Sequence, residues 1–405
     1  MSRRATLSSF VSLLILVGCA RSDESAIVAG SGLTIDTIAG IVTVSAGGPT
    51  AWSDSAGWRL VEDGALEGGV GTPGELVNPR DFAVDERGYV YVVDTKPEVI
   101  KVFDEKGRFV RSFGREGAGP GEFRVALHAV GAGRLIVHDP QNSRVSVFDT
   151  SGTYLRSWVG TCCYWTRPSI DTRGRIAVPT RPPDGAIRAF LRFDSLGTPL
   201  DSVVVAEPPS SPEWTFRQGK NMMMSTAVLF SPQGDAAFSA AGEIIHGWSG
   251  AYRLAVSDNG RDTLRVFRRA WTPEPVTGGR RDAAYDRRVA DLAKSMEIEE
   301  AAVRLQFEKE KIPATLPAFA GISVDGLGNT WVHIDPDSAL TRFDVFDAAG
   351  VYLGPVEVPL LVAKWSSAWG RDAMYVRKDS EDGSPRIVRF RIERSVREPV
   401  TKGTK

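Results

Sequence analysis

A phenylalanine-aspartate pair recurs in this chain with a fixed spacing of 45 residues. The pairs are Phe103-Asp104, Phe148-Asp149 and Phe193-Asp194. A glycine stands three residues after each aspartate, at Gly107, Gly152 and Gly197. Glycine adopts positive φ without strain, so each pair indicates a tight turn between two strands. A period of about 40–50 residues built from short strands is typical of β-propellers. We therefore predict a ring of β-sheets.

The strand-like segments group into units of four strands. The first unit occupies residues 81–113, and the second repeats it at an offset of 45 residues and includes Phe148-Asp149. Further units occupy residues 169–205, a weaker stretch at 228–267, and residues 322–347. A sixth unit shows only two good strands, at 374–376 and 387–392. An open blade edge would invite aggregation, so we expect residues 41–44 and 58–61 to supply the two missing strands. The prediction is an all-β, six-bladed β-propeller whose N- and C-terminal strands share one blade; a seventh blade would need another full repeat.

Aspartates recur at the ends of the predicted strands, at Asp85, Asp94, Asp104, Asp139 and Asp149. Short carboxylates in such positions usually accept hydrogen bonds from turn N–H groups. A calcium site of the EF-hand kind needs a denser run of ligands than this chain contains. We expect a structural role for these side chains.

Three segments carry a family resemblance. Residues 78–85, the strand that ends at Asp94, and residues 113–123 with their glycine-proline-glycine-glutamate-phenylalanine stretch resemble NHL-type repeats of bacterial six-bladed β-propeller lipoproteins. The similarity extends over about residues 41–393 and is strongest at 77–160. The fourth unit departs from the pattern, because Ser257-Asp258 stands where the Phe-Asp pair is expected. The resemblance implies a propeller in the cell envelope.

The first residues of the chain are typical of an export signal. Arg3 and Arg4 precede a short apolar stretch that is too short to span a bilayer as a helix. Residues 16–19 resemble a lipobox, which predicts a signal peptide over 1–18 and acylation of Cys19. Residues 19–40 then form a flexible tether, and residues 41–405 form the propeller. This predicts a lipid-anchored protein on the outer or cytoplasmic membrane, facing the periplasm or exterior, exported by the Sec or twin-arginine route.

The net charge and the cysteine content limit the kinds of partner and the kinds of cysteine chemistry that we expect. Without residues 1–18 the formal charge changes from −1 to −3, which gives no electrostatic basis for nucleic-acid binding. Cys162 and Cys163 are adjacent and belong to no CxxC motif. Two free thiols, a vicinal disulfide and a metal-binding pair all remain open for them.

The strand pattern stops at about residues 278–314. Tyr285, Val289, Leu292 and Met296 follow helical spacing, so we predict a helical insertion between blades four and five, with a break near Ile298. The insertion could brace the ring, cover one face as a lid, or dock a partner.

The chain has four histidines, each of which we expect to be an ordinary turn or strand residue; His128 and His333 are the two candidates for metal ligands. His128 lies near an inner strand of blade two and His333 lies in blade five, so their rings could point into a common channel. Some propellers similar to NHL proteins are metal-dependent lyases or lactonases with a site in the channel. The chain has no G-x-S-x-G elbow and no Walker or dinucleotide motif.

Two functional hypotheses follow from the sequence. The first is a monomeric, non-catalytic scaffold that carries no cofactor and binds an envelope protein, peptide or glycan through loops on one face. The second is a lyase or lactonase with a divalent metal held in the channel, for which His128 and His333 are the candidate ligands.

Overall fold

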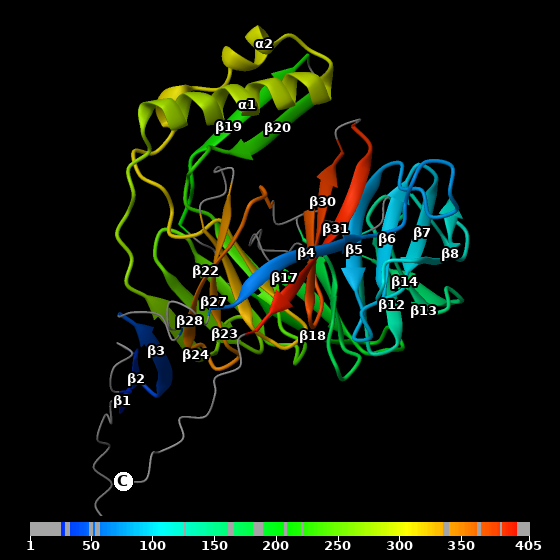
Figure 1. Cartoon of the computed structure of the whole chain (residues 1–405), viewed down its shortest axis with the longest axis horizontal. Helices are drawn as coiled ribbons and strands as arrows, with labels where there is room; N and C mark the ends of the chain where they lie inside the picture. Colours follow the sequence, from blue (N-terminus) through cyan, green and yellow to red (C-terminus); the bar gives the residue numbers. More distant parts are fainter. Residues whose placement is uncertain are drawn as a thin grey trace, which may run out of the picture.

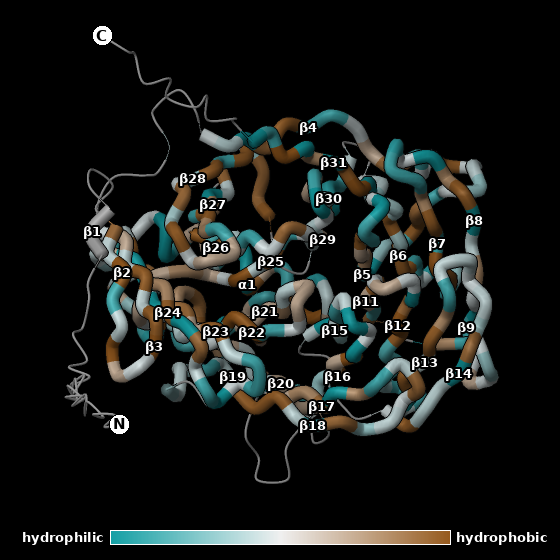
Figure 2. Tube along the Cα trace, turned by 90° about the horizontal axis from the view of Figure 1, so that it is seen from below, coloured by the Kyte–Doolittle hydropathy of each residue, from teal (hydrophilic) through white to brown (hydrophobic). Residues whose placement is uncertain are grey.

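The chain forms a six-bladed β-propeller (Figures 1 and 2). The computed structural model describes residues 26–28, 33–47, 52, 57–124, 127–160, 166–180, 189–205, 209–219, 222–334, 340–362, 366–380 and 383–394. Six four-stranded blades surround a central channel, and the inner strand of every blade contributes to the channel wall. The architecture predicted from the repeat is confirmed.

The blades have the following strands. Blade one contains β5 (Pro79–Val84), β6 (Val90–Thr95), β7 (Glu98–Phe103) and β8 (Phe109–Phe113). Blade two contains β11 (Leu127–Gly131), β12 (Arg134–Asp139), β13 (Arg144–Asp149) and β14 (Tyr154–Val159). Blade three contains β15 (Ser169–Ile170), β16 (Ile176–Thr180), β17 (Ala189–Phe193) and β18 (Pro199–Val204). A short parallel pair, β9 (Arg115–Glu116) and β10 (Glu122–Phe123), links blades one and two.

The other three blades follow the same order. Blade four contains β21 (Gly234–Phe238), β22 (Ile244–Trp248), β23 (Arg253–Ser257) and β24 (Thr263–Arg269). Blade five contains β25 (Gly321–Val324), β26 (Thr330–Ile334), β27 (Thr341–Phe346) and β28 (Tyr352–Val358). Blade six contains β29 (Ser367–Trp369), β30 (Ala373–Asp379), β31 (Pro385–Glu393) and β4 (Arg59–Ala65).

The antiparallel order of the strands gives the ring two distinct faces. The chain passes from the outer strand of one blade to the inner strand of the next at one face, which we call the upper face. The turns between first and second strands, and between third and fourth strands, lie at the opposite, lower face. The Phe-Asp turns therefore all belong to the lower face.

The aspartates of the Phe-Asp pairs close the lower turns as predicted. Asp104 Oδ1 accepts the N–H groups of Lys106 at 3.0 Å and Arg108 at 2.9 Å. Asp194 Oδ1 accepts those of Leu196 and Thr198, each at 2.8 Å. The hydrogen bond from the Thr198 backbone is the main cause of the lowered pKa of Asp194. These turns hold ionised carboxylates as local caps.

The glycine of each pair also sets the distance between blades. Gly152 has φ +97°, and an added Cβ would lie 2.5 Å from the ring of Phe113 on β8. Gly197 has φ +88°, and its Cβ would lie 2.6 Å from the indole of Trp158 on β14. In both cases the neighbour belongs to the outer strand of the preceding blade. The 45-residue signal therefore encodes a turn and the contact between adjacent blades.

Ring closure follows the predicted principle but uses different strands. Blade six combines three C-terminal strands with one N-terminal strand, β4, which pairs with β31. The prediction that residues 41–44 supply a second strand is wrong. These residues belong to β3 (Ile41–Ala46), which pairs in parallel with β24 at the outer edge of blade four. The missing inner strand is β29, which has only three residues and gives no periodic signal.

The outer edge of blade four continues beyond β3. Strands β2 (Leu33–Ile38) and β1 (Ala26–Val28) follow it and make a seven-stranded sheet. The tether predicted over residues 19–40 is therefore wrong at its C-terminal end. The Thr and Ile residues at 34–38 are β-branched and suit an added strand.

Blade four begins later than predicted. Residues 228–230, expected to be its first strand, precede the strand, and β21 is built from small residues instead. Between blades three and four lies an unpredicted hairpin of β19 (Glu213–Gln218) and β20 (Met222–Ala227). Small residues give β21 little β-propensity, which explains why the strand was misplaced.

The helical insertion predicted between blades four and five is present. It contains α1 (Gly278–Met296), α2 (Glu300–Arg304) and the 3₁₀ turn η1 (Lys309–Lys311). Glu297 ends α1 in the left-handed conformation, and its N–H bonds to the carbonyls of Ala293 and Lys294, close to the predicted break. None of the helices among the described residues is both long and apolar enough to cross a membrane.

The hairpin and the helices form one body, which we call the insertion unit (β19, β20 and residues 274–316). Trp214 of β19 stacks on Phe307 with 4.7 Å between ring centroids, and its Nε1 donates to the Glu308 carbonyl at 2.9 Å. The Tyr285 hydroxyl of α1 donates to the Phe307 carbonyl at 2.8 Å. The buried core of this body contains no residue from the blades; it consists of Trp214, Phe216, Val228, Phe230, Val276, Ala284, Tyr285, Val289, Ala293, Val303, Phe307, Ile312 and Leu316.

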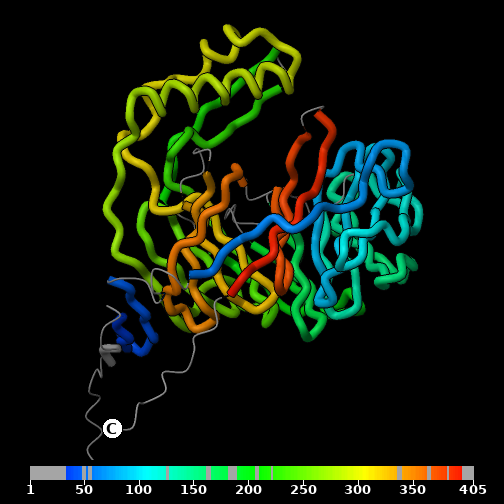
Figure 3. Tube along the Cα trace, viewed as in Figure 1, coloured from blue at the N-terminus to red at the C-terminus, as the bar shows by residue number. Residues whose placement is uncertain are grey.

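The insertion unit stands above the upper face. Figures 1 and 3 show it projecting from the ring, with the hairpin between α1 and the blades. Figure 2, seen from below, places α1 over the part of the ring that contains β21, β22 and β25. The helix thus packs on the hairpin and covers part of the ring.

Candidate functional site

The central channel encloses a cavity of about 250 Å³. Residues of β5, β11, β21, β25 and β29 line it, together with β15 and the segment just before it. Most of the lining residues are apolar, with the small Ala83, Ala129 and Ala237 among them. Its polar members are Thr166, Ser169, Ser323, Ser367, Trp369, His128 and Arg167. Only the last two of these lining residues are ionisable.

His128 is held in the wall by hydrogen bonds at both ring nitrogens. Nδ1 lies 2.8 Å from Asp81 Oδ2, and Nε2 lies 2.9 Å from the Tyr91 carbonyl oxygen. The His128 backbone N–H also donates to Asp81 Oδ2 at 2.8 Å. These bonds fix the position of the ring and leave neither nitrogen directed into the cavity without a partner.

Asp81 is fully buried and ionised. Burial alone would raise its pKa, but the Arg167 guanidinium, the His128 ring and the hydrogen bonds from His128 outweigh burial and lower the pKa to about 2. A buried carboxylate is tolerated when it is paired and hydrogen-bonded. Asp81 is therefore the counterion of Arg167 and also a hydrogen-bond partner of His128.

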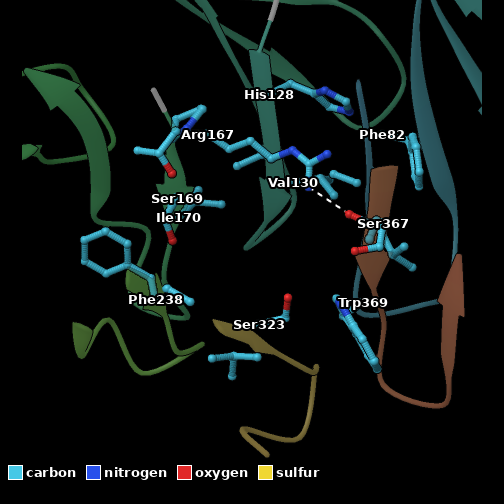
Figure 4. A pocket seen from close by; sticks show the side chains of 18 of the residues that line it. Phe82, His128, Val130, Arg167, Ser169, Ile170, Phe238, Ser323, Ser367 and Trp369 are labelled. Carbon is cyan, nitrogen blue, oxygen red and sulfur yellow. Dashed lines mark hydrogen bonds between the residues drawn. The ribbon is translucent and has the colours of Figure 1, made fainter. Parts of the chain in front are cut away.

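Arg167 crosses the channel. Its Nε donates to Asp81 Oδ1 of blade one at 2.5 Å, and its Nη1 donates to the Ser367 carbonyl of blade six at 2.9 Å. Arg167 itself precedes the inner strand of blade three, which lies on the opposite side of the ring from blade six. Figure 4 shows the side chain reaching across towards Ser367. Its side chain is 22% exposed, so part of it faces the cavity.

The candidate metal ligands occupy different positions. His128 lines the cavity, whereas His333 lies on β26, the second strand of blade five, where Nε2 is 3.1 Å from the Ser323 hydroxyl. The His333 ring packs edge-on against Phe343 at 4.6 Å. Within the described ranges, no three His, Cys, Asp or Glu side chains are arranged to hold a metal ion. Cys19, Cys162 and Cys163 lie outside the described residues.

Asp81 and Arg167 could not be predicted as a pair from the sequence. Asp81 begins a predicted strand, and Arg167 belongs to no repeated motif. The two residues are 86 positions apart and meet only because the ring brings blades one and three together. One local feature could have pointed to Asp81. It is an acidic residue within the inner strand β5, where it is buried.

The hairpin of the insertion unit presents a second surface on the same side of the ring. Trp214 and Phe216 face α1, and the alternate positions face away from it. One of these, Met223, is 65% exposed. Figure 1 shows that this side of the hairpin faces the ring.

Comparison with known proteins agrees with the architecture. The family model DUF5128, described as a 6-bladed beta-propeller, matches residues 83–128, which extend from the inner strand of blade one into that of blade two. No curated protein matches the chain.

Several solved structures resemble the chain at low identity. A member of the DUF4221 family from Bacteroides vulgatus is 12% identical, with 84% of this chain and 99% of that chain covered and a TM-score of 0.46. A protein of Bacteroides fragilis described as exported is 12% identical, with 88% and 100% covered and a TM-score of 0.49. The PQQ-bound aldose sugar dehydrogenase of Streptomyces coelicolor is 13% identical, with 84% and 99% covered and a TM-score of 0.43.

Proposed function

We propose that this protein is a lipid-anchored, extracytoplasmic β-propeller that binds a protein, peptide or glycan on its upper face without catalysing a reaction. The anchor is proposed at Cys19, after removal of residues 1–18, and the bound partner is proposed to be an envelope component. The protein acts as a monomer and takes no cofactor or nucleic acid in this proposal.

The insertion unit is the observation that carries the proposal. Two separate chain segments, on either side of blade four, leave the ring at the same face and share one core. Neither segment is needed to complete a blade, since all six blades have four strands without them. Function in such folds commonly resides in added segments placed on a rigid scaffold.

The bonding in the channel favours binding over catalysis. A general base needs a lone pair within reach of the substrate. Both nitrogens of His128 and both oxygens of Asp81 already take part in hydrogen bonds within the wall. These groups are therefore arranged to fix one another and to hold Arg167 in place.

A crosslinking experiment tests the binding face. A photo-crosslinking amino acid at Met223 samples the upper side, and the same residue at Leu196 samples a lower turn; the two native side chains are 65% and 66% exposed. In the source cell, we expect a discrete adduct from position 223 and none from position 196. Adducts from position 196 alone, or from neither position, would overturn the proposed face.

The anchor is tested separately. Cys19→Ser should abolish acylation, leave the precursor unprocessed and release the protein from the membrane fraction, because the acyl chains supply the membrane affinity. Cys162→Ser serves as the matched control and should change none of these properties. Unchanged fractionation and mass of Cys19→Ser would refute the anchor.

A further inference from the structure

We propose that the channel cavity binds a carboxylate group through Arg167. The carboxylate could belong to a small organic acid or to the C-terminus of a peptide. This inference rests on the proposed function, because it assigns a ligand chemistry to the same binding protein. It adds a site inside the ring to the surface site on the insertion unit.

The charge balance of the wall is the first argument. Arg167 and His128 are the ionisable side chains among the residues that line the cavity, and Asp81, which bonds to both, is not itself a lining residue. The other lining residues are uncharged. A cavity wall that presents a guanidinium and no acidic side chain favours an anion in a partly desolvated channel, because electrostatic interactions are stronger there than in water.

The hydrogen-bonding groups of the wall are the second argument. Trp369 Nε1 is shielded from solvent and has no hydrogen-bond partner among the described residues. Figure 4 shows the nitrogen-bearing edge of this indole directed towards the cavity, below Ser367. A buried donor without an acceptor costs about 1–3 kcal/mol. A carboxylate brings acceptors only, so it is a ligand that could satisfy this donor.

The position of Arg167 is the third argument. Its bonds to Asp81 and to the Ser367 carbonyl fix the plane of the guanidinium across the channel. A guanidinium that is held in advance loses little conformational entropy when it binds a planar carboxylate. The entropic cost of ordering a flexible side chain on binding is thereby reduced.

The size of the cavity limits the ligand. A volume of about 250 Å³ lies just below the range of about 300–1,000 Å³ typical of sites for drug-sized ligands. It suits a short-chain acid or the last residue of a peptide. The small side chains of Ala83, Ala129 and Ala237 leave this space open, and Val84 and Val324 give it an apolar end.

A purely structural role for Arg167 makes a different prediction. Arg167 links blade three to blades one and six, so it could act only as a brace across the ring. A brace would affect stability and would give no dependence on carboxylates. Binding measurements therefore separate the two roles.

The test uses the purified full-length protein and isothermal titration calorimetry with paired probes. Succinate is compared with its neutral analogue succinamide, and the peptide Ala-Ala-Ala is compared with its C-terminal amide. We expect one carboxylate probe to bind while its amide does not; succinate identifies a free acid as the source, and the tripeptide identifies a chain terminus. No binding by either carboxylate at millimolar concentration would overturn the inference.

Variants locate the site. Arg167→Gln should weaken binding by at least about tenfold, since a charge-assisted pair contributes about 1.5–3 kcal/mol, and Arg167→Lys should retain part of the affinity. Arg108→Gln, which changes an arginine paired with Asp104 at the lower face, should leave affinity unchanged. If Arg167→Gln does not fold, Trp369→Phe, which removes only the indole N–H, should weaken binding by a few fold. Unchanged affinity in the folded Arg167 or Trp369 variants refutes the site.

The two proposals can fail independently. An adduct at position 223 with no carboxylate binding would support the scaffold and refute the channel site. Carboxylate binding that depends on Arg167, with no adduct at position 223, would support the channel site and refute the upper-face scaffold.

Discussion

The substitution Asp81→Asn tests the buried network of the channel. The folded pKa of Asp81 is about 2, against an ordinary value of 3.8. This difference corresponds to about 2.5 kcal/mol of stability at neutral pH. Asparagine keeps the size of the side chain but removes the charge and turns an N–H group towards either His128 or Arg167. Loss of one partner from a buried ion pair typically costs about 3–5 kcal/mol, so we expect a loss of about 3 kcal/mol.

The pH dependence gives this prediction its sign. The pKa of Asp81 is depressed in the folded state, so its contribution is complete above pH 4 and is lost as pH falls towards 2. At pH 3 about half of the 2.5 kcal/mol remains. The difference in unfolding free energy between wild type and Asp81→Asn should therefore shrink by about 1 kcal/mol between pH 5 and pH 3.

Urea denaturation followed by tryptophan fluorescence at pH 7, 5 and 3 measures these differences. Asp149→Asn is the control, because it makes the same chemical change at an exposed turn where the side chain keeps an oxygen acceptor for the N–H groups of Ser151 and Thr153. The reasoning would be refuted if the difference in unfolding free energy between wild type and Asp81→Asn were as large at pH 3 as at pH 5. A difference no larger than that caused by Asp149→Asn would also refute it.

Three further predictions concern other parts of the molecule. Burial, followed by the Arg253 charge, lowers the pKa of His246 to about 4. The free energy of unfolding should therefore fall as pH drops from 6.5 to 4, by at most about 3 kcal/mol. The variant His246→Gln should show a smaller change of the urea midpoint over this pH range. Gly197→Ala, at φ +88° and 2.6 Å from an indole, should cost about 2–4 kcal/mol, whereas Gly133→Ala, at φ +69° with open space around it, should cost less in the same thermal melts. Trp214→Ala should remove about 3–5 kcal/mol from the insertion unit and open it to limited proteolysis, with the blades still resistant; simultaneous cleavage of both would contradict a separate core.

The lower face could be predicted because its signals are local. Asp104 and Gly107 belong to one turn, and the same four-residue chemistry recurs in blades two, three and five. Turn chemistry is determined over a few residues, so it remains visible in sequence. The spacing of these turns then determines the size of each blade, and the number of blades follows.

The upper face could not be predicted because its contacts are non-local. The bond from Arg167 to Asp81 joins residues of two blades, and the bond to Ser367 spans 200 positions. The hairpin at β19 and β20 was missed for a related reason: its apolar side packs against α1, which lies more than 50 residues later. Each segment alone resembles an ordinary strand pair or an amphipathic helix, and only the ring brings them together.

Blade four lost its Phe-Asp pair without losing its turn. Ser257 takes the place of the aspartate, and its hydroxyl accepts the Gly260 N–H at 2.8 Å and donates to the Asp262 carbonyl at 2.9 Å. A shorter polar side chain thus closes the same turn. The weak signal in this blade reflects an exchange of capping residue, and the blade itself is complete.

Blade four also carries the largest additions to the ring, the insertion unit and β1–β3. The insertion unit flanks it at the upper face, and β1–β3 extend its outer edge through β24. Figure 1 shows β1–β3 at the end of the molecule opposite the insertion unit. Six residues separate Cys19 from Ala26, so the chain makes seven steps between them, and an extended chain covers at most about 3.5 Å per step. An anchor at Cys19 would therefore hold this edge within about 25 Å of the bilayer and direct the insertion unit away from the membrane, where a partner can reach it.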